Sequence, residues 1–237
     1  MKLSLEPTCS CIVPFYNEDE RVIRVLKSLS KVPALSQVIC VDDGSTSPAV
    51  SELVRNELKD VTLIRLQKNK GKSAAVAAGL RMVKTPYVML MDADLSHIIP
   101  GEIESAITKV IENKDIDMLI MRGINDPWFS KLIRGEILTS GQRILRTDDL
   151  HEVIVGMRPQ RYQLEYAINF YMMRKYKKTY WISCSAKNFV KIHKIGLIKG
   201  LTGEIAMYID MIRYVGVILP IKSLIFFCKS NIDSASR

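Results

Sequence analysis

The chain has 237 residues, of which 48% are hydrophobic, and it carries a formal net charge of +9. This composition favours a folded domain with a sizeable core and excludes global disorder. The charge is uneven, because residues 1–127 hold 16 Lys/Arg against 17 Asp/Glu, whereas residues 128–237 hold 18 against 8. We therefore expect the second half to face something anionic: lipid head groups, a phosphate-bearing substrate or nucleic acid.

Cysteine usage argues against a disulfide framework and against a structural zinc site, because the count is odd and there is no CxxC pair. Cys9 and Cys11 have strand spacing, so we expect both on one face as small core residues. We expect no signal peptide, since the N-terminal segment has no long apolar run. A reduced, cytoplasmic compartment fits best. The five positions are Cys9, Cys11, Cys40, Cys184 and Cys228.

The longest apolar stretch, Tyr214–Phe227, contains Pro220 and Lys222. It is shorter than the roughly 20 residues that a spanning helix needs. Two alternatives stay open: the stretch lies on a membrane surface, or it packs as a core helix, which is the safer interpretation.

The first half alternates short apolar runs with helical patterns. The runs are continuous rather than alternating, as expected for strands that are buried on both faces. Expected strands are Cys9–Val13, Gln37–Val41, Val61–Leu66, Tyr87–Met91 and Asp117–Met121. Expected helices are Glu18–Leu29, Pro48–Leu58, Lys72–Met82 and Gly101–Asn113. This succession predicts an α/β domain with a mostly parallel sheet and helices on both faces.

The pattern changes after Asp126-Pro127. The segments Phe129–Leu145, Leu164–Tyr176 and Leu201–Leu219 look helical, and Ile182–Lys199 is mixed. We find no linker-like stretch, so we expect residues 1–127 and 128–237 to be two halves of one domain. The second half is expected to be a basic, helical extension.

Residues 68–79 read KNKGKSAAVAAG. The segment follows an apolar run, and its second part has a helical pattern. The GKS triplet suggests a P-loop, which requires a further glycine five residues before Gly71. Leu66 occupies that position, so the motif fails. The strand–loop–helix context still favours anion binding by amides at the helix start, helped by Lys72.

Three polar clusters follow expected strands: Asn17-Glu18, Asp42-Asp43 and Asp92-Ala93-Asp94. In an open parallel sheet, ligands bind outside the carboxyl ends of the strands. Each cluster has a simpler interpretation, namely a helix start, a turn with an N-cap, and a solvated strand end. We favour function for both acidic pairs, because buried carboxylates are costly without a cation and a one-residue spacing suits a divalent metal.

The ordered motifs CIVPFYNEDE, VICVDDGSTS, NKGKSAAVAAG and VMLMDADLS resemble family 2 glycosyltransferases with the GT-A fold. The resemblance covers roughly the first half of the chain. It implies a nucleotide-sugar donor with a UDP or GDP moiety and a divalent metal, Mg²⁺ or Mn²⁺. It places Pro14, Tyr16, Glu18 and Asp43 around the base and ribose.

The same resemblance places Gly71 and Lys72 near the nucleotide. It makes Asp92 and Asp94 a DxD motif, in which Asp94 is the surest metal ligand and Asp92 also contacts the donor. Within the family, the DADL form is most similar to polyprenyl-phosphate (dolichyl-phosphate type) sugar transferases.

Two residues of the second half are candidates for catalysis. Arg143 follows Ser140-Gly141-Gln142, where similar transferases carry a Ser-Gly-Phe-Arg-like element, and Gln142 departs from that pattern. Arg143 is either a bidentate phosphate ligand or a solvated helix arginine. Glu165 is either a general base or sugar-hydroxyl ligand, or a first-turn acid favoured by the helix dipole.

Basic residues gather in two further groups of the second half. Such cations are common at helix ends without any partner, but together with the charge balance they favour an anionic membrane surface or a lipid phosphate. The first group is Arg174, Lys175, Lys177 and Lys178, and the second is Lys187, Lys191, Lys194 and Lys199, with His193 among them.

These features predict a metal-dependent, inverting glycosyltransferase whose acceptor is a polyprenyl phosphate at the cytoplasmic membrane face. The first alternative is transfer to a hydroxyl of a glycan or small molecule. A non-enzyme alternative, a receiver-type signalling domain, is prompted by Asp42-Asp43, but Asp92 and Lys114 imitate its further residues poorly. A third possibility, a nucleic-acid-binding protein, is suggested by the charge, and weak salt dependence of any DNA binding would remove it. We expect no nucleic-acid partner.

Overall fold

A central β-sheet organises the computed structural model, which describes residues 8–18, 20–123, 135–161, 163–188, 222 and 227–232. Within these residues the sheet has eight strands in the order β10-β8-β6-β7-β4-β1-β2-β3. β7 is antiparallel to β4 and β6, and the other neighbours are parallel, which confirms a mostly parallel sheet. The strands are β1 (Cys9–Phe15), β2 (Leu35–Asp42), β3 (Val61–Arg65), β4 (Tyr87–Leu90), β6 (Met118–Gly123), β7 (Arg143–Arg146), β8 (Thr179–Cys184) and β10 (Ser230–Asn231).

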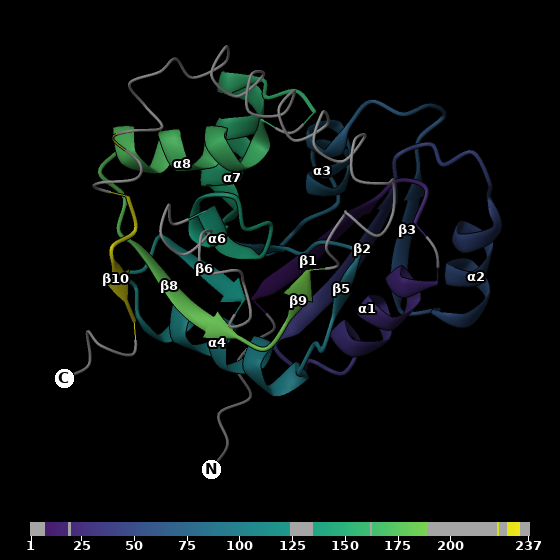
Figure 1. The fold of residues 1–237 in the computed structure, drawn as a ribbon, viewed down its shortest axis with the longest axis horizontal. Helices are drawn as coiled ribbons and strands as arrows, with labels where there is room; N and C mark the ends of the chain where they lie inside the picture. Colours follow the sequence, from purple (N-terminus) through teal and green to yellow (C-terminus); the bar gives the residue numbers. More distant parts are fainter. Residues whose placement is uncertain are drawn as a thin grey trace.

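Helices cover both faces of the sheet (Figure 1). One core contains side chains of α1, α2 and α4, and the other contains side chains of α3, α6, α7 and α8. The described helices are α1 (Arg21–Leu29), α2 (Ala49–Glu57), α3 (Lys72–Leu80), α4 (Pro100–Glu112), α6 (Gly135–Leu138), α7 (Thr147–Glu152), the π-helix η1 (Val153–Met157) and α8 (Leu164–Arg174). The sheet is therefore buried on both sides, as its continuous apolar strands require.

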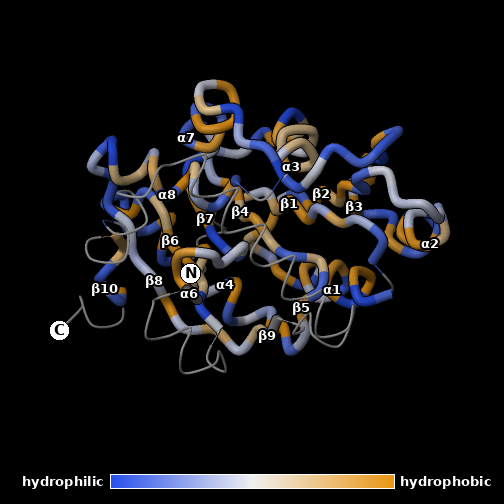
Figure 2. The backbone as a smooth tube through the Cα atoms, turned by 45° about the horizontal axis from the view of Figure 1, so that its top comes forward, coloured by the Kyte–Doolittle hydropathy of each residue, from blue (hydrophilic) through white to orange (hydrophobic). Residues whose placement is uncertain are grey.

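Successive residues of each central strand point into opposite cores. Cys11 and Val13 lie in the first core, whereas Ile12 lies in the second. Alternating hydrophilic and hydrophobic colours on α1 (Figure 2) agree with its buried face, which includes Val22 and Leu26. The layered arrangement thus follows from strand and helix periodicity.

The cysteines behave as core residues. All five are buried and none forms a disulfide. Cys9 and Cys11 lie in the same core, as their spacing predicted. Burial raises the pKa of the Cys9 thiol to about 12, so the group stays protonated at neutral pH.

The expected helix over Phe129–Leu145 is wrong in its described part. The chain forms only the short helix α6 there and then enters strand β7. Ile144 and Leu145 are fully buried on the two faces of the sheet, because β7 is inserted between β4 and β6. An apolar pair beside charged residues fits the period of a helix as well as that of a strand. Pairing with the antiparallel neighbours β4 and β6 stabilises the strand.

The remaining expectations for the C-terminal part divide into two groups. The helix expected at Leu164–Tyr176 is confirmed as α8. The expected helix Leu201–Leu219, most of the apolar stretch Tyr214–Phe227 and the division at residue 127 lie outside the described residues. Phe227, which is described, is buried in the second core. Within the described ranges, no helix combines the length and apolar character needed to cross a membrane.

A small second sheet continues from the strand end that carries Asp92 and Asp94. β5 (Leu95–Ser96) pairs antiparallel with β9 (Lys187–Asn188). The pairing ties the chain that follows Asp94 to the chain that follows β8, and the two strands lie side by side in Figure 1. The acidic strand end is therefore anchored on its C-terminal side by the second half.

Candidate active site

The carboxyl ends of β1, β2, β3 and β4 meet at one edge of the sheet, because these neighbouring strands are parallel. The Asp43 amide donates to the Phe15 carbonyl over 2.8 Å, and the Leu66 amide donates to the Asp42 carbonyl over 2.8 Å. The polar segments that follow the strands are thus fixed to one another. This is the edge where the sequence predicted a ligand crevice.

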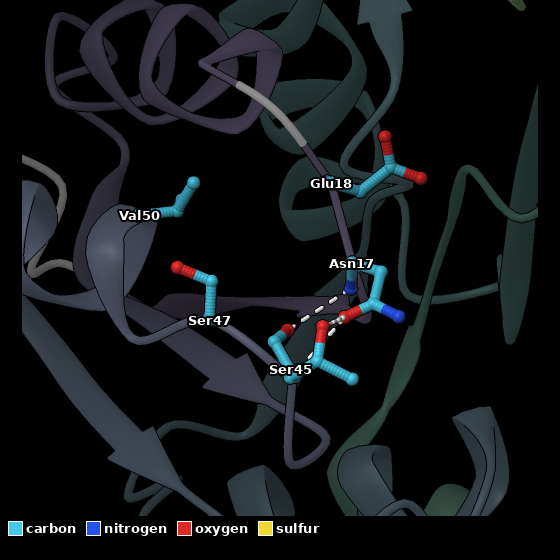
Figure 3. Close-up of a pocket in the computed structure, with 6 residues that line it drawn as sticks. Asn17, Glu18, Ser45, Ser47 and Val50 are labelled. Atoms are coloured by element: carbon cyan, nitrogen blue, oxygen red, sulfur yellow. Dashed lines mark hydrogen bonds between the residues drawn. The ribbon is translucent and has the colours of Figure 1, made fainter.

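An open pocket of about 350 Å³ lies between the segments that follow β1 and β2 (Figure 3). The Asn17 amide donates to Ser45 Oγ over 3.0 Å, and Asn17 Oδ1 accepts the Thr46 amide at 2.9 Å. Asn17 therefore joins the two segments, and its positive φ of 50° serves this link. The side chains that line the pocket come from Asn17, Glu18, Ser45, Thr46, Ser47 and Val50.

Three residues of the first strand end were predicted to contact the base and ribose. Pro14 is half-buried within β1, and Tyr16 is 41% exposed beyond its end. Glu18 accepts a charged hydrogen bond from Arg21 at 3.1 Å, as a residue at a helix start would. Their contact with a nucleotide stays a prediction.

Asp42 and Asp43 are bound into the protein. Asp42 is fully buried, and its carboxylate accepts the Ser45 amide at 2.8 Å and the Ser51 hydroxyl and lies 3.5 Å from Arg65 Nε. Asp43 is 3% exposed, and its two oxygens accept the amides of Lys70 and Gly71 at 2.9 and 2.7 Å. Both carboxylates therefore have donors that offset the cost of burial.

The glycine loop 66–71 binds an anion, but that anion is the Asp43 carboxylate. The Lys70 and Gly71 amides point at Asp43. Gly71 has φ of 89°, and an added Cβ would lie 2.9 Å from the Arg161 Cα, so a larger residue does not fit. The loop is thus fixed in shape by Asp43, and it begins α3 with Lys72 as the first residue.

A charged cluster of Lys72, Asp92 and Glu165 lies at the centre of the strand-end edge. Lys72 Nζ donates to Asp92 Oδ1 and to Glu165 Oε1, both over 2.6 Å. The side chains are 22%, 23% and 11% exposed, respectively. The structure therefore brings together three of the predicted site residues, one each from the start of α3, the end of β4 and the start of α8.

Two opposing effects act on the Lys72 ammonium. Burial alone would lower the pKa of Lys72, but the charges and hydrogen bonds of Asp92 and Glu165 outweigh it and raise the pKa above its ordinary value. Lys72 is therefore a permanent cation at neutral pH. The ammonium is shared between two carboxylates.

The acidic pair suits a hard divalent cation. Asp92 already faces a cation in Lys72, and Asp94 is half-buried two residues later. Among the described residues, no group of three or more His, Cys, Asp or Glu side chains could hold a metal alone. Mg²⁺ commonly binds through one or two carboxylates together with substrate phosphates, and the two aspartates fit that pattern.

Arg143 lies beneath the charged cluster. It is fully buried, so the solvated helix arginine is excluded. Its guanidinium donates to the Ser140 carbonyl, to Asn169 Oδ1 at 2.8 Å and to the Glu165 carbonyl at 3.4 Å. Burial lowers the pKa of Arg143, and the Glu165 charge opposes that shift. Arg143 thus joins the 140–142 loop to α8.

The 140–142 loop packs directly against Asp92. A Cβ added at Gly141 would overlap the Asp92 carboxylate, and Gln142 Nε2 donates to Asp92 Oδ2 over 3.4 Å. The glutamine that departs from the family pattern therefore contributes a donor to the acidic strand end. Asn169 was missed by the sequence analysis, although a polar residue at i+4 from Glu165 inside an apolar helix was a usable signal.

Part of the first basic group is neutralised locally. Lys177 lies 3.1 Å from Asp149 and 3.6 Å from Asp117, and Lys178 lies 2.8 Å from Asp115. In the second group, the described Lys187 is exposed, and Lys191, Lys194, Lys199 and His193 lie outside the described residues. The charge excess of the second half is thus only partly available to an anionic partner.

Comparison with known proteins gives matches over most of the fold. Residues 10–178 match the family described as glycosyl transferase family 2. Undecaprenyl-phosphate 4-deoxy-4-formamido-L-arabinose transferase of Proteus mirabilis is 31% identical over 129 residues, which cover 52% of this chain and 39% of that protein. Dodecaprenyl-phosphate galacturonate synthase of Rhizobium johnstonii is 30% identical over 118 residues, which cover 47% and 34%. The chain therefore spans less than half the length of these curated relatives.

Among solved structures, glucosyl-3-phosphoglycerate synthase of Mycobacterium tuberculosis in complex with Mn²⁺ and UDP-glucose has a TM-score of 0.68. The sequence identity is 15%, and the match covers 89% of this chain and 80% of that one. A structure of the same enzyme with phosphoglyceric acid gives 0.68 at 14% identity, covering 89% and 81%. At this identity the likeness shows a shared GT-A fold.

Proposed function

Because the chain belongs to glycosyl transferase family 2, we propose that it is an inverting glycosyltransferase that moves a sugar from a nucleotide-sugar donor to a polyprenyl phosphate. The acceptor would meet the enzyme at the cytoplasmic face of a membrane. Relatives whose names specify undecaprenyl and dodecaprenyl phosphate support this acceptor class. Family membership also leaves the receiver-type signalling domain without support.

The observation that carries the proposal is the position of Glu165. Its Oε1 accepts a hydrogen bond from Lys72 at 2.6 Å, so this carboxylate is a counter-ion of Lys72. A hydroxyl acceptor needs a positioned base, whereas a phosphate oxygen is already ionised at neutral pH. The charged cluster therefore favours a phosphate as the attacking group.

In the proposed reaction, a phosphate oxygen of the acceptor attacks the anomeric carbon on the face opposite the donor diphosphate. The new carbon–oxygen bond forms as the old one breaks, and the bonding electron pair leaves with the nucleoside diphosphate. Asp92 and Asp94 would hold Mg²⁺ or Mn²⁺, which when bound neutralises the leaving diphosphate. Lys72 offers a further positive charge, and Asp43 keeps the loop that carries Lys72 in place.

The donor part is tested by measuring thermal stabilisation of the protein by a set of UDP- and GDP-sugars with and without Mn²⁺. We expect at least one sugar nucleotide to stabilise the protein only with the metal. If none of the sugar nucleotides stabilises the protein, the metal-dependent reaction is contradicted.

The acceptor part is tested by offering the matching donor with a polyprenyl phosphate and with the corresponding polyprenol. We expect transfer to the phosphate alone, and Glu165→Gln is expected to retain turnover. The alternative, transfer to a hydroxyl, is favoured by the presence of a carboxylate beside the acidic strand end. Near-complete loss of turnover in Glu165→Gln with donor binding intact would establish that alternative.

A further inference from the structure

One ammonium in the charged cluster is shared by two carboxylates. Lys72 donates to Asp92 and to Glu165 over the same distance of 2.6 Å, although the two carboxylates belong to β4 and α8. Asp92 belongs to the predicted donor site, whereas Glu165 lies on the side that the second half contributes. A single ammonium thus links the two sides of the site.

The backbone of Glu165 is held in place by the protein. Its carbonyl accepts from the buried Arg143, which also binds Asn169 one turn further along α8. Lys72 reaches the cluster through a flexible four-carbon stem from the first turn of α3. Lys72 can therefore redirect its ammonium at low cost.

A nucleoside diphosphate that binds beside Asp92 would meet Lys72 already engaged. Its phosphate oxygens and the Glu165 carboxylate are both anions that accept from an ammonium, so they compete for the positive charge of Lys72. We propose that Glu165 is an internal competitor of the donor diphosphate, holding the Lys72 ammonium until the diphosphate takes it over. This inference rests on the proposed function, and it makes Glu165 a positioning residue that tunes donor affinity.

The test is calorimetric binding of UDP or GDP, whichever binds the wild type, in the presence of Mn²⁺. Replacing Glu165 by Gln removes one of the two negative charges that hold Lys72, so we expect the diphosphate to bind about fivefold more tightly than to the wild type. Lys72→Met should weaken binding about tenfold. In the Lys72→Met/Glu165→Gln double variant the gain from Glu165→Gln should vanish, because no ammonium is left to release.

Glu152→Gln, a change of the same charge at an exposed position, controls for the overall charge of the protein. A gain in Glu165→Gln that persists in the double variant, or that Glu152→Gln reproduces, would reduce the effect to general electrostatics and overturn the proposal. Unchanged or weaker binding in Glu165→Gln would overturn it as well. A wild type that binds neither nucleotide with Mn²⁺ would instead contradict the proposed function, so the two failures are distinguishable.

Discussion

Two acidic strand ends lie at the same edge of the sheet, and their surroundings differ. Asp42 and Asp43 are 0% and 3% exposed, and main-chain amides account for three of the donors that they meet. Asp92 is 23% exposed, and the side chains of Lys72 and Gln142 are among its contacts. Backbone amides thus hold much of the first pair, whereas side chains that can move contact Asp92.

This difference predicts a structural role for the first pair and a ligand-binding role for the second. A carboxylate that is satisfied by backbone amides has no reason to leave them, and removing it leaves buried donors without an acceptor. A carboxylate that is held by a lysine can exchange that cation for another one. We therefore expect the same residue type to stabilise the loops at one strand end and to bind metal and donor at the other.

The largest effect is expected from Asp94→Asn. Loss of the proposed metal-binding charge should lower turnover about 100-fold or more and abolish Mn²⁺-dependent stabilisation by the donor, while the free energy of unfolding falls by less than in Asp42→Asn, because Asp94 is only half-buried. Turnover and donor-dependent thermal shifts measure the first two quantities, and urea unfolding measures the third. Asp115→Asn, which removes the exposed partner of Lys178, is the matched control. A metal response that survives Asp94→Asn would contradict the role of this pair.

Asp42→Asn should produce the opposite outcome. The amide can still accept from the Ser45 amide, but it offers a donor to Arg65 and loses the charge that Ser51 and Arg65 meet. We expect a loss of about 2 kcal/mol in the free energy of unfolding, measured by urea denaturation. Turnover of the folded fraction should change little; a large loss of turnover without destabilisation would place Asp42 in the reacting centre.

Asp43→Asn should have an intermediate, mixed effect. The new side chain keeps one acceptor for the two amides of the glycine loop, so one amide loses its partner. A loss of about 1 kcal/mol in stability and a several-fold weaker binding of nucleotide are expected, because the loop positions Lys72. Unfolding and calorimetric titration on one preparation measure both. Weaker binding without any loss of stability would instead favour direct contact of Asp43 with the nucleotide.

The first half could be predicted in detail because its strands are buried on both faces and its motifs follow strand ends. Periodicity therefore located β1 to β4 to within a few residues, and the parallel arrangement brought Asp43, Lys72 and Asp92 to one edge. The sequence did not predict which groups these residues contact at that edge. Sequence spacing shows that Asp43 and Gly71 are near each other, but it does not show that their hydrogen bond replaces a phosphate contact.

The second half was harder because long-range pairing decides its elements. Ile144 and Leu145 form a strand only because β4 and β6 lie on either side of them, 50 or more and 20 or more residues away in the chain. Arg143 was interpreted as a surface residue or a phosphate ligand for the same reason. Burial of an arginine depends on the carbonyls and amides that surround it, and these come from a loop and from α8.

The smallest expected effect concerns the buried thiols. Because burial raises the pKa of Cys9 to about 12, the folded protein keeps this proton at pH values where the unfolded chain begins to lose it. Stability contributed by the protonated thiol is complete below about pH 9 and falls as the pH rises toward 12. At pH 8 the native protein should therefore react with a thiol reagent only through transient opening.

That slow reaction reports on the two acidic pairs independently of any ligand. All five cysteines are buried, so the labelling rate follows the population of the opened chain when closing is fast relative to labelling. Asp42→Asn should raise the rate about 30-fold, in line with a loss of about 2 kcal/mol. Asp94→Asn should raise the rate much less, because Asp94 is only half-buried whereas Asp42 is fully buried. An equal increase in Asp94→Asn would assign this pair a structural role as well, and the contrast between the two strand ends would disappear.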